Sequence, residues 1–217
     1  RERDKFGYYR HDPKDPDSLS SNFIFPIHAD ADGYAWIGTS GGGLNRFDWR
    51  TGEVVRYSNN PDNPNSLGSN SLLSIFEDGD GVLSIGTTNG LDRYNAISKT
   101  FTHFRREPSD PDSLSSNFVY SIHEDSAGYL WIGTSAGLDR FDKKTTQFTH
   151  YRSDPNDPAT LSGAKPLALL EDNSGSLWIG TSEHGLNRFD PGTQRFTRYQ
   201  HNARDEGSIS SDSILSI

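Results

Sequence analysis

Short apolar runs separated by polar stretches dominate the chain. The runs are rich in aromatic and β-branched residues, and Gly, Pro, Asn or Asp bound each of them, as in 72–77 and 148–151. These features are typical of β-strands. No apolar stripe with the helical period of about 3.6 residues is visible. The pattern therefore predicts an all-β protein.

One of these runs recurs at a fixed spacing of about 47 residues. Its form is Gly-x-x-Trp-Ile-Gly-Thr, with Ser84 replacing Trp in the second copy, and its copies begin at Gly33, Gly81, Gly128 and Gly175. A second marker, Ser-Leu-x-Ser/Gly, keeps the same spacing, and its central apolar residue is Leu19, Leu67, Leu114, Leu161 and, in a fifth copy, Ile209. A period of this length is typical of propellers and solenoids.

Each repeat contains four strand signals, which we name A to D in chain order. Strand A is expected at 23–28, 72–77, 118–124 and 167–171, and strand B is the Trp-Ile-Gly-Thr segment. Strand C is expected at 44–47, 91–94, 138–141 and 186–189, and strand D at 54–57, 101–104, 148–151 and 196–199. Four short antiparallel strands per repeat predict a β-propeller blade.

Both ends of the chain continue the repeat. Residues 6–10 match 101–105, which predicts the outer strand of a preceding blade, and 213–217 match the start of strand A of a following blade. The predicted boundaries are 1–18 for that outer strand and its link, 19–66, 67–113, 114–160 and 161–208 for blades 1 to 4, and 209–217 for the next inner strand. We expect four complete blades plus one flanking strand at each end, cut from a larger ring of seven blades. The alternative is a closed ring of four blades with frayed extra strands.

Composition narrows the function classes. The chain has 30 acidic and 21 basic residues, a net charge of −9, no Cys and no Met. Nucleic-acid binding needs a basic face, so the charge disfavours it. No apolar run approaches the ~20 residues of a membrane span, so this segment is expected to make no membrane contact. The absence of Cys excludes disulfides and thiolate chemistry, and the absence of an initial Met suggests a piece of a longer polypeptide.

The repeat resembles a known family. The series Asp-Pro-x-Asp-Pro-x-Ser-Leu-Ser-Ser-Asn, then Glu-Asp-x-x-Gly-x-Leu-Trp-Ile-Gly-Thr, then Gly-Leu-Asp/Asn-Arg-Phe-Asp is best seen in 110–142 and 157–190. It is similar to the two-component regulator propeller repeat. This resemblance implies an extracytoplasmic sensor region of a bacterial signalling protein, commonly two seven-bladed propellers and a β-sandwich, followed by a membrane span and a histidine kinase, hybrid kinase or diguanylate cyclase. Known ligands of such regions are often polysaccharide fragments.

The resemblance implies a function in signal transduction. We expect a periplasmic ligand-sensing region of an inner-membrane protein, which binds a saccharide or another small ligand and relays it to a cytoplasmic output domain through a homodimer. The open blade faces are expected to contact neighbouring blades of the same polypeptide or of another chain. The first alternative is a non-catalytic interaction scaffold, and the second is an enzyme of the sialidase or lyase propeller type. No catalytic constellation can be placed, so we expect this segment not to be an enzyme.

Arginine occupies one fixed position in every repeat, and tryptophan occupies another in three of the four repeats. The arginines Arg46, Arg93, Arg140 and Arg188 follow this rule, as do Trp36, Trp131 and Trp178. An arginine ring could clamp an anionic sugar, but pairing with the acidic A–B turn of the same blade, such as Glu124 or Asp125, is favoured. The Trp residues are expected to pack between blades, and Ser84 is expected to leave a looser contact.

The acidic A–B turns raise the question of a metal site. Asp30 and Asp32, or Asp78 and Asp80, stand two apart beside a Gly, as in calcium loops. The later ligands of such loops are missing, and the other two blades lack the second Asp. The His residues show no ligand spacing. We therefore expect tight turns, no metal and no cofactor.

The loops that join the strands are the expected place for ligand binding. The D-to-A links (12–22, 60–70, 107–117, 154–164) and the B–C loops (40–43, 88–90, 135–137, 182–185) should share one face of the propeller. Residues that break or mark the repeat there are candidates for ligand contact. These candidates are Ser40, Gly42, Asn89, Ser135, Lys165, Glu183 and His184. Trp49 is added because it lies outside the repeat pattern, just after strand C, and is a candidate exposed aromatic residue.

Overall fold

The chain folds into four antiparallel sheets. The structure is a computed structural model that describes residues 7–217, and in this range it contains strands and no helix. Blade 1 has β1 (Ile24–Ala29), β2 (Tyr34–Thr39), β3 (Leu44–Asp48) and β4 (Val54–Tyr57). Blade 2 has β5 (Leu72–Glu77), β6 (Leu83–Thr87), β7 (Gly90–Asn95) and β8 (Thr100–Phe104). Blade 3 has β9 (Val119–Glu124), β10 (Leu130–Thr134), β11 (Gly137–Phe141) and β12 (Phe148–Tyr151). Blade 4 has β13 (Pro166–Glu171), β14 (Leu177–Thr181), β15 (Leu186–Asp190) and β16 (Arg195–Tyr199).

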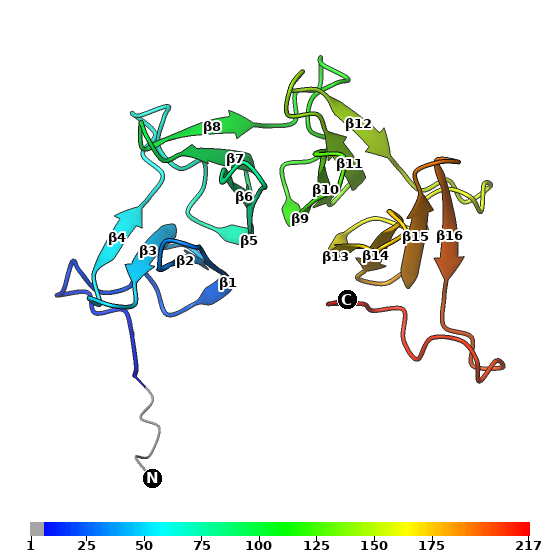
Figure 1. Cartoon of the computed structure of the whole chain (residues 1–217), viewed down its shortest axis with the longest axis horizontal. Coiled ribbons are helices and arrows are strands. Elements are labelled where there is room, and N and C mark those ends of the chain that lie inside the picture. The colour runs from blue at the N-terminus through cyan, green and yellow to red at the C-terminus, as the bar shows by residue number, and fades with distance from the viewer. Residues whose placement is uncertain (1–6) are drawn as a thin grey trace, which may run out of the picture.

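The sheets are propeller blades arranged as an open arc (Figure 1). The first strand of each blade, β1, β5, β9 or β13, lies toward the common centre, and the last lies at the rim. The inner strands contact one another in the order β1, β5, β9, β13, and no comparable contact joins β13 to β1 within residues 7–217. The predicted all-β propeller is therefore confirmed, and the alternative of a closed four-bladed ring is wrong.

The Gly of each Ile-Gly-Thr segment lets neighbouring blades approach closely. A Cβ on Gly86 would lie 2.6 Å from the Val119 carbonyl oxygen, and one on Gly38 would lie 3.0 Å from the Leu72 Cβ. The inner strand of one blade thus rests directly on the second strand of the blade before it. A larger residue would push the inner strand of the next blade away from this second strand, so the repeat needs Gly here.

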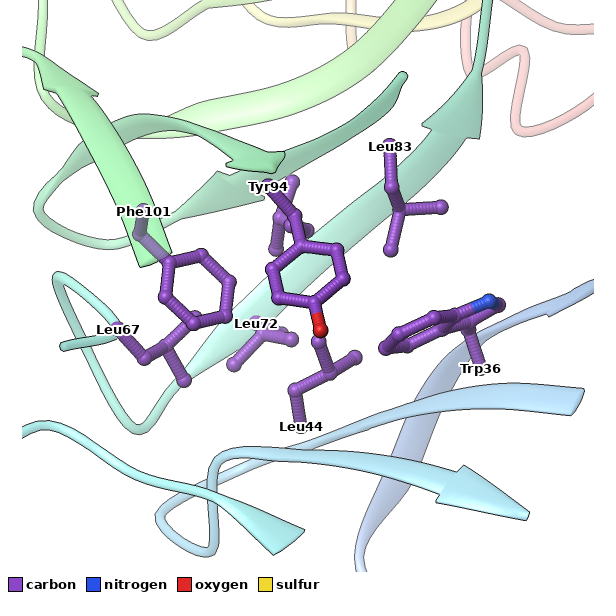
Figure 2. Packing of buried hydrophobic residues seen from close by; sticks show 8 residues of the cluster. Trp36, Leu44, Leu67, Leu72, Leu83, Tyr94 and Phe101 are labelled. Carbon is purple, nitrogen blue, oxygen red and sulfur yellow. The ribbon is translucent and has the colours of Figure 1, made fainter. Parts of the chain in front are cut away.

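Apolar side chains fill the space between consecutive blades. Between blades 1 and 2, Trp36 packs beside Leu83 and Tyr94 (Figure 2), while Tyr57 closes the cluster and hydrogen-bonds the Tyr94 hydroxyl at 3.0 Å. Between blades 3 and 4, Trp131 lies 5.1 Å from Phe189, ring centre to ring centre, and is 2% exposed. The predicted role of the Trp residues in packing between blades is confirmed at these two interfaces.

The flanking segments have no strand partner, yet they lie where neighbouring blades would supply side chains. Residues 7–10 and 213–217 form no strand, because the middle strands of their own blades are not in this chain. Tyr9 packs on Phe47 at 4.4 Å, as Phe104 packs on Phe141 at 4.8 Å. A Cβ on Gly180 would lie 2.6 Å from Ile214. Both ends therefore continue the repeat spatially.

Candidate ligand site on the loop face

The D-to-A links and the B–C loops form one surface, which we call the loop face. Backbone hydrogen bonds join the links 60–70 and 107–117 to the B–C loop of the blade before each. Gly41 and Gly43 both donate to the Asn70 carbonyl oxygen at 2.9 Å, and Gly90 donates to that of Asn117 at 2.7 Å. Because the loops are hydrogen-bonded to each other, the side chains on this face are held on a rigid scaffold.

In blades 2 and 3 a histidine fixes the link. His103 contacts the buried Asp92 carboxylate through Nδ1 at 2.6 Å and the Pro64 carbonyl through Nε2 at 3.0 Å. His150 makes the same contacts with Asp139 and Pro111. Both ring nitrogens face acceptors, so the doubly protonated form satisfies them best. The hydrogen bond to the carboxylate accordingly raises the pKa of each imidazole above its usual value.

In blades 1 and 4 an arginine takes this role. The corresponding strand C residues are Asn45 and Asn187, which are neutral, and Arg56 and Arg198 donate to carbonyl oxygens of the link. Arg56 Nε, for example, lies 2.7 Å from the Ser18 carbonyl. Two side-chain pairs, Asp with His and Asn with Arg, thus solve the same problem of anchoring a long loop.

A polar pocket opens on the loop face at blade 3. Its volume is about 440 Å³, and its lining consists of Arg106, Ser115, Ser116, Ser135, Ala136 and Arg152. Both arginines are exposed, and neither guanidinium lies within ion-pair distance of a carboxylate in the described part of the chain. The Ser116 and Ser135 hydroxyls hydrogen-bond each other at 2.5 Å, which joins a link to a B–C loop. Two free guanidinium groups beside hydroxyls suit an anionic, hydroxylated ligand.

Arg106 breaks the pattern of its repeat position. At the equivalent position Asn59, His11 and His201 each contact a carbonyl oxygen of their own link. Arg106 makes no such side-chain bond, so its guanidinium stays available. The signal for this residue was present in the sequence, because the paired arginines at 105–106 follow strand D in no other repeat. Arg106 and Arg152 were nevertheless missed by the sequence reasoning.

The sequence candidates are scattered over the loop face rather than gathered in this pocket. Ser135 is the one that lines it. Asn89 bonds the Gly68 carbonyl at 3.1 Å, and a Cβ on Gly42 would meet Ser20, so both hold the loops together. Ser40, Lys165 and Glu183 are exposed. The His184 ring packs on Gly163, and Trp49, 47% exposed, lies in the β3–β4 turn at the opposite end of the blade.

The repeated arginines have varied partners. Arg93 pairs with Asp78 at 2.6 Å, as predicted for an ion pair with the A–B turn. For the other three arginines this prediction is wrong. Arg46 lies 3.5 Å over the Tyr34 ring, Arg140 lies 4.7 Å over Tyr129, and Arg188 bonds the Ser176 hydroxyl. The reason is that the Trp of strand B already donates to the turn Asp, as Trp131 does to Asp125 at 2.7 Å.

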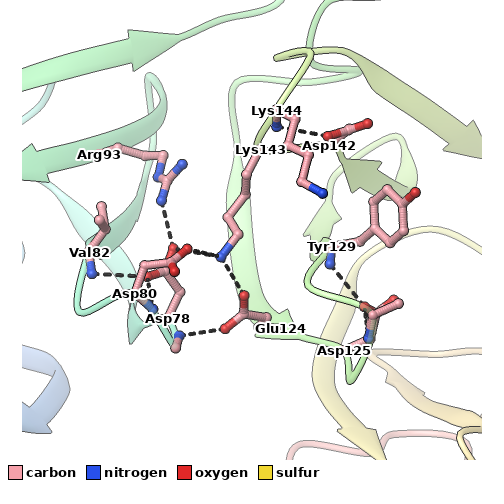
Figure 3. A network of polar contacts seen from close by, with 12 residues as sticks. Asp78, Asp80, Val82, Arg93, Glu124, Asp125, Tyr129, Asp142, Lys143 and Lys144 are labelled. Carbon is pink, nitrogen blue, oxygen red and sulfur yellow. Dashed lines mark hydrogen bonds and ion pairs between the residues drawn. The ribbon is translucent and has the colours of Figure 1, made fainter.

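The acidic turn of blade 2 is occupied by a lysine (Figure 3). Oxygens of Asp78, Asp80 and Glu124 lie within 4.8 Å of one another, and Lys143 of blade 3 reaches all three. Burial alone would lower the pKa of Lys143, but hydrogen bonds to Asp80 and Glu124 raise it. The hydrogen bond from Lys143 lowers the pKa of Asp80. The built-in ammonium takes the place that a cation would need, and it ties blades 2 and 3 together.

Comparisons with known proteins agree with this architecture. A family model described as "Two component regulator propeller" matches residues 18–41, 113–136 and 160–183. Each match joins the end of a link to strands A and B of its blade. No curated protein matches the chain. The predicted resemblance to this repeat family is confirmed.

Solved structures with the same fold include extracellular domains of bacterial signalling systems. The extracellular domain of the putative hybrid two component system BT3049 from B. thetaiotaomicron is 29% identical in sequence to this chain and superposes with a TM-score of 0.74. The match covers 84% of this chain and 25% of that domain. That of BT4673 from the same organism is 24% identical, with a TM-score of 0.72 over 89% and 24%. Virginiamycin B lyase from Staphylococcus aureus, 15% identical, has a TM-score of 0.61 over 83% of this chain and 56% of the lyase. The chain spans about a quarter of the length of the first two extracellular domains.

Proposed function

We propose that the chain, which matches the two-component regulator propeller model in three of its blades, is part of the extracytoplasmic ligand-sensing region of a bacterial membrane-bound signalling protein. The similar structures that support this are named extracellular domains of signalling systems. In residues 7–217 no helix has the length and apolar character needed to cross a bilayer. We propose that a homodimer of the full-length protein relays the signal.

The observation that carries the binding function is the Arg106–Arg152 pocket. The chain has a net charge of −9, yet this part of the loop face presents two arginines that have no carboxylate partner among residues 7–217. Guanidinium groups pair carboxylates through two parallel N–H···O bonds. The serine hydroxyls beside them suit the hydroxyl groups of a sugar ring. We infer a carboxylate-bearing saccharide as the ligand, bound by differential contacts that favour one state of a dimer.

The test is calorimetric titration of the chain with an oligogalacturonide and with its methyl-esterified, uncharged counterpart. We expect saturable binding of the acidic form only, weakening as salt rises. Arg152→Ala and Arg106→Ala should each weaken binding about tenfold or more, since a hydrogen bond to a charged group contributes about 1.5–3 kcal/mol. Arg204→Ala, at an exposed arginine in the link that follows blade 4, is the matched control and should bind normally.

Two results would overturn the proposal for this pocket. One is equal affinity for the charged and uncharged saccharides, and the other is unchanged binding in the double variant Arg106→Ala/Arg152→Ala. Because both arginines are exposed, the variants should unfold like the parent chain, so loss of binding cannot come from loss of fold.

A protein-interaction scaffold is the second candidate function, and a separate observation favours it. The start of the inner strands exposes large apolar side chains beside the loop face: Phe23 is 74% exposed, Phe25 65% and Phe118 47%. Exposed aromatic residues are enriched at protein–protein contacts. Under this function a Phe23→Ser/Phe25→Ser variant loses a protein partner while saccharide binding is unaffected.

A further inference from the structure

The face that each blade turns toward the next is filled by rings in blades 1 and 3. In blade 3, Trp131 pairs with Arg140, and Arg140 with Thr149, so the three side chains share one face of the sheet. Tyr129 and Tyr151, two residues away along the same strands or their extension, lie on this face as well. Trp131 and Tyr151 are 5.3 Å apart, and Arg140 covers the Tyr129 ring. Tyr34, Trp36 and Tyr57 form the same set in blade 1.

Blade 2 lacks two of these rings. Val82 stands where blade 3 has Tyr129, and Ser84 where it has Trp131. Ser84 is fully buried, and among the described residues its hydroxyl has no hydrogen-bond partner. Phe76 partly compensates, packing against the core between blades 2 and 3. Two aromatic side chains have nevertheless been lost from one face without equal replacement.

The loss of these rings also changes the partner of Arg93. With no indole N–H on the Asp78 carboxylate, the guanidinium swings to it, at 2.6 Å, instead of lying over a ring (Figure 3). A hollow of about 430 Å³ remains, lined among others by Val82, Arg93, Thr102 and Phe104. Its volume falls within the ~300–1,000 Å³ of small-molecule sites.

The rim of this hollow is unusual for a surface turn. Ile97 is 96% exposed there, at the position where the other blades have Arg50, Lys144 and Gly192. Asp80, whose side chain is 72% exposed, stands on the opposite side and keeps oxygen lone pairs beyond its bond to Lys143. An apolar interior, a cation, a carboxylate and an exposed Ile at the mouth are together the surroundings of a bound ring with a polar edge.

We propose that this hollow binds a planar aromatic ligand that carries one N–H or O–H donor, of the indole or phenol class. The ring occupies the space between Val82 and Phe104 and presents its face to the Arg93 guanidinium, which attracts the electron-rich ring face. The donor points to Asp80. In the other blades an indole N–H likewise donates to a carboxylate of the A–B turn, at the position of Asp78, at 2.7 to 2.9 Å, and Asp80 is the exposed carboxylate of the same turn in blade 2. The mouth of the site, at Asp80 and Ile97, lies at the opposite end of the blade from the loop face, and the site shares no lining residue with the saccharide pocket.

Indole itself is the probe. Titration of the ¹⁵N-labelled chain with indole should shift the amide signals of Val82, Arg93 and Thr102 saturably, while those of the loop face stay in place. Cyclohexanol, which has a donor but no aromatic face, should bind at least tenfold more weakly. If indole causes no saturable shift at millimolar concentration, or cyclohexanol binds equally well, the proposal is overturned.

Variants that restore the repeat give the second arm of the test. Ser84→Trp and Val82→Tyr each return a ring to the hollow, so each should reduce indole affinity at least tenfold. Val82 is only half-buried, so Val82→Tyr keeps the test valid if Ser84→Trp fails to fold. Ala127→Tyr adds an aromatic residue to the exposed equivalent turn of blade 3 and should leave indole binding unchanged. Unchanged binding in a folded Val82→Tyr variant would also overturn the proposal.

Discussion

Blades 2 and 3 have the same strand order, the same register and the same histidine anchor for the preceding link, yet they stabilise the face turned toward the next blade differently. In blade 3 the turn residue Asp125 accepts from the Trp131 indole, and Arg140 rests on Tyr129. In blade 2, Asp78 instead accepts from Arg93 and contacts Lys143. The identity of one strand B residue thus decides whether a carboxylate is held by a neutral donor or by cations.

This difference teaches how a repeat protein tolerates a broken repeat. Stability in such proteins is the sum of the units and the interfaces between neighbours. The interface between blades 2 and 3 has exchanged ring packing for charge pairing and has gained a hollow in the process. The comparison predicts that the interface between blades 2 and 3 and the interface between blades 3 and 4 are destabilised by different substitutions.

The largest effect should come from Trp131→Ser, which gives blade 3 the strand B residue of blade 2. Trp131 is 2% exposed and fills the space beside Phe189, so its removal should cost about 3–5 kcal/mol of unfolding free energy. Urea unfolding of the chain measures this cost. Trp178→Ser is the matched control, because no following blade covers Trp178 in this chain, and it should cost clearly less. Equal costs would show that the covering blade contributes nothing.

The sequence alone was enough for the blades but not for their contacts. The spacing of the Gly-x-x-Trp-Ile-Gly-Thr copies located every strand to within two residues, because each copy needs the same Gly where the next blade approaches. Arg partners could not be predicted in the same way. Whether Arg140 pairs with Asp125 depends on whether the Trp131 indole already donates to the Asp125 carboxylate. That contact is visible only in the three-dimensional structure.

The same limit explains the incomplete prediction of the candidate site. Ser135 was expected because it lies in a B–C loop, whereas Arg106 and Arg152 come from two different repeats and meet only when blades 2 and 3 pack together. Lys143 likewise follows strand C of blade 3 and reaches the turn of blade 2. Contacts of this kind vary from blade to blade, so a pattern shared by all blades cannot reveal them.

An intermediate effect is expected for Lys143→Met. This change keeps most of the apolar stem and removes the ammonium, which leaves Asp78 and Glu124 facing each other in a partly buried site. We expect a loss of about 1–2 kcal/mol, within the range for hydrogen bonds to charged groups. Urea unfolding at neutral pH measures it, with Lys144→Met as control, because Lys144 is exposed and its ammonium forms no ion pair within residues 7–217.

The pH dependence of this loss tests its cause. Lys143 lowers the pKa of Asp80 and Glu124, so its contribution to stability is present above the ordinary carboxyl pKa and disappears as the pH falls through the lowered values. The parent chain and Lys143→Met should therefore converge in stability in acid. If the difference persists at a pH where these carboxyls are protonated, packing of the lysine stem rather than charge pairing carries the effect.

The smallest effect should come from the feature that the two blades share. The hydrogen bonds to Asp92 and Asp139 raise the pKa of His103 and His150, so each pair stabilises the chain fully below pH 6.5, and this contribution is lost as the pH rises through the raised pKa. His103→Gln and His150→Gln should each reduce the decline in stability between pH 6 and an alkaline pH, by roughly 0.2–1 kcal/mol. Urea unfolding at the two pH values measures each decline.

His123 has a pKa lowered by burial and gives an opposite slope, but it is present in all variants and cancels in the differences. Since the two anchors lie in different blades, their effects should add in the double variant. Unequal single effects would mean that the broken face of blade 2 also weakens the anchor of its link, and the blades would then differ in more than one interface.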